Sequence, residues 1–131
     1  MALGYRKLWL GLGAAFVALV IYLSLSTQTI DAGRIEDVKT GHFLAYFWLM
    51  YWYSQVCRGR AARFAIAAGL VAMGIGLEYL QGMTTYRTFA FSDMRDNAIG
   101  VAAGLALGWG VGGTVLARLE AVYNRSRGIG E

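Results

Sequence analysis

The chain contains four long apolar stretches, rich in glycine and aromatic residues, that are separated by short polar segments. They cover about residues 8–26, 41–57, 61–80 and 96–117. A helix needs about 20 residues to cross the hydrocarbon core of a bilayer, with a range of about 17 to 25. The pattern therefore predicts an all-α, polytopic membrane protein built as a bundle of four transmembrane helices.

The composition favours lipid as the surroundings of this chain. The 131 residues suit a single domain, 1–131, and they are 57% hydrophobic but only 15% charged, whereas soluble domains are about one quarter charged. The mean hydropathy of +0.47 agrees. Cys57 is the single cysteine, which excludes a disulfide within the chain and a cysteine metal cluster.

Basic residues set the expected orientation, because Lys and Arg collect on the cytoplasmic side of membrane proteins. One side of the expected bundle holds eight of them, Arg6, Lys7, Arg58, Arg60, Arg63, Arg118, Arg125 and Arg127, and the other side holds four. We therefore expect cytoplasmic termini, with the connections at about 27–40 and 82–95 outside. The net charge of +4 then reflects topology, and no nucleic-acid partner is predicted.

Polar residues at the edges of the last three stretches all fall on the expected outer side. Ionisable groups near hydrocarbon are costly to hold, so they are candidates for function. Glu78 and Gln81 are three residues apart and share a helix face, and Ser92 is expected to cap the fourth helix. The candidates for a polar rim are Lys39, His42, Glu78, Gln81, Arg87, Asp93 and Asn97.

Three roles remain open for this rim: a latch that ties helix ends together, a ligand site at the outer leaflet, or a catalytic site. In a latch, Arg87 would be the partner of the Glu78 carboxylate. No nucleophile–base pair is evident, since His42 is the sole histidine and no serine lies in a nucleophile elbow. A metal site through His42, Glu78 and Asp93 matches no standard spacing, so neither a metal nor a cofactor is predicted.

The fourth stretch carries glycines spaced by four, at Gly100, Gly104, Gly108 and Gly112. Residues at this spacing share a helix face, and glycine lets another helix approach closely. The stripe predicts a packing seam within the chain, or alternatively a seam for a homo-oligomer or a partner subunit. Ala68, Ala72 and Gly76 give the third stretch a similar face of small residues.

These motifs together resemble the VanZ-like membrane proteins over about residues 35–115. The resemblance is carried by Lys39-x-x-His42-Phe43-Leu44-Ala45-Tyr46, Glu78-x-x-Gln81, Arg87, Asp93 and Asn97-x-x-Gly100, with departures at Val38, Leu77 and Thr85-Tyr86. It implies a small multi-pass protein of the bacterial cytoplasmic (inner) membrane with a role in the cell envelope. The founding member of that family is linked to glycopeptide antibiotic resistance.

We expect a non-enzymatic membrane protein that binds an anionic amphiphile, or a lipid-linked cell-wall or polysaccharide intermediate, at the outer leaflet. Lys39 and Arg87 would hold the anionic head group, and the other rim residues would shape the pocket. One alternative is an accessory subunit of a larger membrane complex. Another is a membrane enzyme acting on a lipid phosphate, with His42 as the acid or base.

Overall fold

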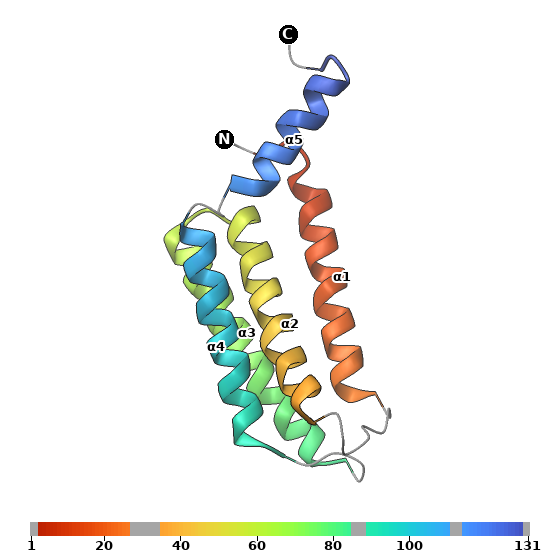
Figure 1. Cartoon of the computed structure of the whole chain (residues 1–131), viewed down its shortest axis with the longest axis vertical. Coiled ribbons are helices and arrows are strands. Elements are labelled where there is room, and N and C mark those ends of the chain that lie inside the picture. The colour runs from red at the N-terminus through yellow and green to blue at the C-terminus, as the bar shows by residue number, and fades with distance from the viewer. Residues whose placement is uncertain (1–2, 27–34, 85–88, 111–113, 130–131) are drawn as a thin grey trace.

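The computed structural model describes residues 3–26, 35–84, 89–110 and 114–129, without the side chains of 35–40. Over these ranges the chain is helical, with α1 (Arg6–Leu25), α2 (Ile35–Val56), α3 (Arg60–Gly82), α4 (Phe91–Trp109) and α5 (Val115–Ser126). Helices α1 to α4 run up and down side by side, and α5 leaves the bundle at the end where both termini lie (Figure 1). The all-α prediction is confirmed for the described residues.

The expected fourth helix, 96–117, is wrong in its bounds. Helix α4 begins at Phe91 and ends at Trp109, where the backbone N–H of Gly110 donates to the carbonyls of Ala106 and Leu107. A separate helix, α5, begins at Val115. Each glycine in a helix interior costs about 1 kcal/mol relative to alanine, so the glycine-rich run 108–113 disfavours a continuous helix. Hydropathy does not reveal this break, because the sequence is apolar on both sides of it.

Helices α2 and α4 pack with their backbones close together. A Cβ atom at Gly100 would lie 2.5 Å from the carbonyl oxygen of Phe43, and one at Gly104 would lie 2.5 Å from that of Phe47. A Cβ atom at Gly108 would overlap the side chain of Ser54. These three glycines therefore form a packing seam within the chain, whereas Gly112 lies outside the described residues.

The core follows this seam. Tyr46, Leu49 and Met50 of α2 are buried against Leu70 of α3 and Val101 of α4. Helix α1 joins through aromatic contacts, since the ring of Phe16 meets Trp48 at 5.9 Å and Trp52 at 5.2 Å. By contrast, the small residues Ala68, Ala72 and Gly76 of α3 are exposed.

At the end of the bundle that carries the termini, two buried polar side chains form caps on other helices. The Arg63 guanidinium donates to the carbonyls of Ser54 at 2.6 Å and Cys57 at 3.1 Å, so it satisfies the end of α2. The amide oxygen of Gln55 accepts the N–H of Leu116 at 3.0 Å, in the first turn of α5. Arg63 thus has a structural role in addition to the topological one expected from its charge.

Helices α1 and α3 are each long and apolar enough to cross a membrane. Only 11% of the most apolar segment of α1 and 28% of that of α3 are buried inside the protein. A core helix of a soluble protein would be mostly covered. Many of the apolar side chains of these two helices, such as Leu19 and Phe64, are instead exposed.

Candidate functional site

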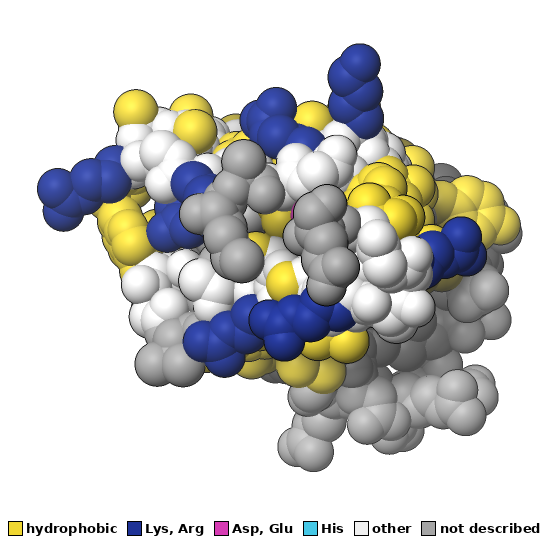
Figure 2. All heavy atoms as spheres, turned by 90° about the horizontal axis from the view of Figure 1, so that it is seen from above, with side chains coloured by type: hydrophobic (Ala, Val, Ile, Leu, Met, Phe, Trp, Pro, Cys, Tyr) yellow, Lys and Arg dark blue, Asp and Glu magenta, His cyan; other side chains and the backbone are white. Residues whose placement is uncertain are grey.

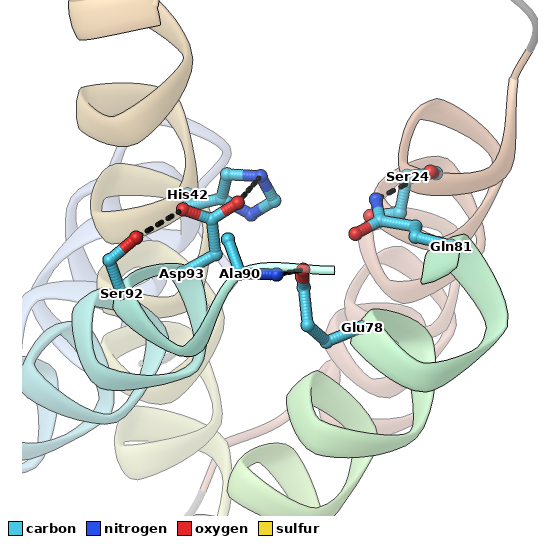
Figure 3. A network of polar contacts seen from close by, with 7 residues as sticks. All are labelled: Ser24, His42, Glu78, Gln81, Ala90, Ser92 and Asp93. Carbon is cyan, nitrogen blue, oxygen red and sulfur yellow. Dashed lines mark hydrogen bonds and ion pairs between the residues drawn. The ribbon is translucent and has the colours of Figure 1, made fainter. Parts of the chain in front are cut away.

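Most of the polar residues expected at the rim meet at the end of the bundle opposite the termini (Figures 1 and 3). Here α1 and α3 end, and α2 and α4 begin. The up-and-down order of the helices therefore brings together residues that are far apart in the sequence. We call this group the polar cluster, consisting of His42, Glu78, Gln81, Asp93 and Asn97.

Glu78 lies on the last turns of α3 and is only 1% exposed. Its Oε1 accepts a hydrogen bond of 2.6 Å from the backbone N–H of Ala90, the N-cap residue of α4. The expected N-cap, Ser92, is wrong, because the helix begins before it. A carboxylate at this position satisfies a donor at the helix start and is also favoured by the helix dipole.

Gln81 ties the end of α3 to the end of α1. Its Nε2 donates a hydrogen bond of 2.6 Å to the carbonyl oxygen of Ser24, and both residues are buried. Glu78 and Gln81 share a face, as their spacing predicts, but they contact different elements (Figure 3). Both side chains hold helix ends in place.

His42 and Asp93 form the more accessible part of the polar cluster. The Nε2 atom of His42 lies 3.9 Å from Oδ2 of Asp93, and the side chains are 14% and 18% exposed. This separation suits an ion pair and is too long for a direct hydrogen bond. Ser92 donates to the other carboxylate oxygen of Asp93 at 3.3 Å. A histidine beside an oriented carboxylate can hold or transfer a proton.

Asn97 lies deeper in the bundle, one turn after Asp93, and is 3% exposed. Its amide packs against Gly74 of α3, next to the ring of Tyr46. Within the described parts of the chain, its Oδ1 has no hydrogen-bond partner. An unsatisfied buried carbonyl costs about 1 to 3 kcal/mol, which makes Asn97 a candidate contact for a bound polar group.

Two expected rim residues fall outside what the structure describes. The side chain of Lys39 and the whole of Arg87 belong to the undescribed parts of the chain, so the expected pairing of Arg87 with Glu78 stays a prediction. In the described regions, no three His, Cys, Asp or Glu residues are grouped so that they could hold a metal ion.

Sequence reasoning missed two partners of the polar cluster. Tyr46 is 1% exposed and lies beside Asn97. Its position one turn after His42 in α2 is a spacing that could have indicated a shared face. Ser24 contributes only its backbone carbonyl, so its side chain gave no indication of this role.

This chain has limited similarity to known proteins. No family model matches it, and no solved structure does. An uncharacterized protein of the fission yeast Schizosaccharomyces pombe is 36% identical over 72 residues, which are 53% of this chain and 44% of that protein. The chain therefore spans less than half the length of this relative.

The assignment to the VanZ-like family is wrong. No family model supports it, and a eukaryotic relative conflicts with a family of bacterial proteins. The motifs behind the resemblance are short groups of polar residues at helix ends, where any helical bundle in a membrane places its polar side chains. The expected links to antibiotic resistance and to the cell envelope have no remaining support.

Proposed function

We propose that this chain is a multi-pass membrane protein that binds the anionic head group of an amphiphile at the polar cluster. The observation that carries the proposal is the His42–Asp93 pair, which is accessible at one end of a bundle with an apolar exterior. An amphiphile in the adjoining leaflet would place its head group at the level of this pair, with its chains against the outer helix faces.

The exterior of the bundle supports the membrane placement. Large apolar side chains are exposed along α1 and α3, for example Leu12, Leu19, Phe64 and Ile75. Side chains of Lys and Arg are spread over the end that carries the termini (Figure 2). The positive-inside rule assigns such an end to the cytoplasm, which leaves the polar cluster on the opposite side.

The topology is tested by labelling single cysteines in a Cys57→Ser background in whole cells. Cysteines at Thr29 and Thr85 should react with a membrane-impermeant maleimide from outside, and one at Ser126 should react only after permeabilisation. The reverse pattern would reject the orientation and with it a site at the outer leaflet.

Charges in the sequence favour an anionic head group. Lys39 precedes His42 by three residues, and Arg87 lies in the connection between α3 and α4. Glu78 accepts the backbone N–H of Ala90, and Asp93 lies beside His42. We propose that the cationic groups of Lys39 and Arg87 contact the head group.

Binding is tested by native mass spectrometry of the full chain purified in a mild detergent with a defined lipid mixture. Phosphatidylglycerol should be retained in preference to diacylglycerol, which lacks a charged head group, and Lys39→Ala should lose this preference while keeping its thermal stability. Arg60→Ala, which removes an exposed cation at the opposite end of the bundle, is the control and should retain it. Equal retention of both lipids by the unmodified chain would reject the proposal.

The His42–Asp93 pair also supports a second candidate, an enzyme acting on a lipid phosphate. A histidine oriented by a carboxylate serves as a general acid or base. Release of phosphate from a lipid phosphate monoester, lost in His42→Gln while lipid binding persists, would favour this candidate. The accessory-subunit alternative has less support from the glycine stripe, because Gly100, Gly104 and Gly108 pack against α2 of the same chain.

A further inference from the structure

A second site lies at the end of the molecule that carries the termini. It is a pocket of about 300 Å³ between the start of α1 and helix α5, lined by Tyr5, Leu8, Trp9, Leu119, Glu120 and Tyr123. We call it the aromatic pocket. It is far from the polar cluster, since the two occupy opposite ends of the bundle (Figure 1).

Glu120 places a negative charge in this pocket. Its carboxylate accepts hydrogen bonds from the backbone N–H groups of Gly4 at 2.8 Å and Tyr5 at 3.1 Å, and from the Trp9 indole at 2.5 Å. Burial raises the pKa of this carboxyl, but the three hydrogen bonds outweigh burial and hold the pKa below its ordinary value. The group is therefore ionised at neutral pH.

This charge has no basic partner within the protein as described. Among the described residues, no Lys or Arg forms an ion pair with Glu120. Its three donors are dipoles, so they stabilise the carboxylate without neutralising it. Glu120 thus contributes a negative charge to the pocket that favours a cation.

The walls of the pocket indicate what kind of cation it fits. The rings of Tyr5 and Tyr123 meet at 6.2 Å and 78°, which makes a corner of two aromatic surfaces. Aromatic faces attract cations, and quaternary ammonium groups are characteristically bound this way. The Tyr123 ring does attract cations in this structure, since the guanidinium of Arg127, which is not part of the pocket lining, lies 5.2 Å from its centre. Leu8 and Leu119 complete the lining, which suits methyl groups better than a hydrated metal ion with its need for oxygen ligands.

We propose that the aromatic pocket binds an alkylammonium group, such as the trimethylammonium of a choline head group. The surroundings suit the rest of a phospholipid head group, because Arg6 and Lys7 are exposed next to Tyr5 and could contact a phosphate. Basic side chains are spread over this end of the molecule (Figure 2). The same chemistry would also bind a soluble quaternary ammonium compound.

The test is isothermal titration of the full chain, in maltoside micelles, with tetramethylammonium chloride against sodium chloride at equal ionic strength. Saturable binding is expected for tetramethylammonium alone. Glu120→Gln should weaken it about tenfold or more, because the pocket loses its charge. Tyr123→Leu should weaken it about two- to fivefold, the worth of one ring. Tyr22→Leu removes an exposed tyrosine of α1 outside the pocket and should leave binding unchanged.

Glu120→Gln could also loosen the attachment of the N-terminus to α5. Tyr123→Leu leaves the three hydrogen bonds of Glu120 in place, so it decides the outcome if the first variant does not fold. Absence of saturable binding, or unchanged affinity in Tyr123→Leu, would overturn the proposal. Neither result depends on the lipid preference of the polar cluster, so the two proposals fail separately.

Nanodiscs distinguish the two sources of the ammonium group. Preferential retention of phosphatidylcholine over a diacylglycerol lacking a head group, lost in Tyr123→Leu, identifies a lipid ligand. Binding of tetramethylammonium without such a preference identifies a soluble ligand of the same class. Both results support the assigned chemistry.

Discussion

The carboxylate of Glu78 lies 2.6 Å from the backbone nitrogen of Ala90, so the end of α3 caps the start of α4. Gln81, one turn further along α3, holds the end of α1 by donating to the carbonyl oxygen of Ser24. These buried contacts belong to the fold, whereas the His42–Asp93 pair is partly open to the surroundings. The polar cluster therefore combines a latch with a partly exposed pair, and only this pair is left for the ligand site that the sequence presented as an alternative to a latch.

Removal of the Glu78 carboxylate should destabilise the bundle. Glu78→Ala leaves the N–H of Ala90 without its acceptor, and an unsatisfied buried group costs about 1 to 3 kcal/mol. Glu78→Gln keeps a carbonyl oxygen at the same place and should cost less. Thermal unfolding in detergent measures both. Asp96→Ala is the control: the ion-pair partner of Asp96 is the exposed Arg95, and such pairs contribute about 0 to 1 kcal/mol. Equal losses for Glu78→Ala and Asp96→Ala would contradict the capping role.

The two roles within the polar cluster predict opposite effects on stability and lipid retention for substitutions at Gln81 and at His42. Gln81→Ala should lower stability by about 1 kcal/mol, because it removes a buried hydrogen bond to Ser24. His42→Asn should change stability little, since His42 is partly exposed and 3.9 Å from Asp93, yet it should reduce retention of anionic lipid. Melting temperature and native mass spectrometry on the same samples separate the effects. A large loss of stability in His42→Asn would make the pair part of the latch.

The glycine seam gives a matched test of close packing. Gly104→Ala should destabilise by about 1 to 3 kcal/mol, because its Cβ atom would meet the backbone of α2. Gly69→Ala on α3 meets open space and should stabilise by up to about 1 kcal/mol through helix propensity. Denaturant or thermal unfolding compares them. If both variants behave alike, the backbones of α2 and α4 are not in contact at Gly104.

Order along the chain was enough to predict where the polar cluster forms. Alternating helices place the start of α2, the end of α3 and the start of α4 at one end, so the meeting of His42, Glu78 and Asp93 follows from topology. The spacing of Gly100, Gly104 and Gly108 likewise indicated a close helix contact. These predictions rest on the spacing of residues along a helix and on the alternating direction of successive helices, both of which can be inferred from the sequence.

Tertiary partners were harder to predict, because they depend on contacts that leave no local pattern. Gln81 bonds to a backbone carbonyl of Ser24, and Gln55 caps a helix that hydropathy had merged with α4. Glu120 accepts a hydrogen bond from the backbone N–H of Gly4, which is 116 residues away in the sequence. The family assignment failed for a related reason, since short polar motifs describe helix ends in general better than they describe ancestry.

Acidification should release the N-terminus from α5. The pKa of Glu120 is lowered in the folded chain, so its contribution to stability is fully present above the unfolded pKa of about 4.5. It is lost as the pH falls through the lower folded pKa, because a protonated carboxyl is a weaker acceptor for the N–H groups of Gly4 and Tyr5. Hydrogen exchange of the segment that contains Gly4 and Tyr5, corrected for intrinsic rates, should therefore show protection at pH 6 that fades toward pH 3. In Glu120→Gln the protection should be weak at both values, whereas Asp96→Asn should behave like the unmodified chain. Equal protection of the unmodified chain and Glu120→Gln at pH 6 would show that the Glu120 charge does not hold the segment that contains Gly4 and Tyr5, and the attachment would then rest on the packing of Tyr5 and Trp9 alone.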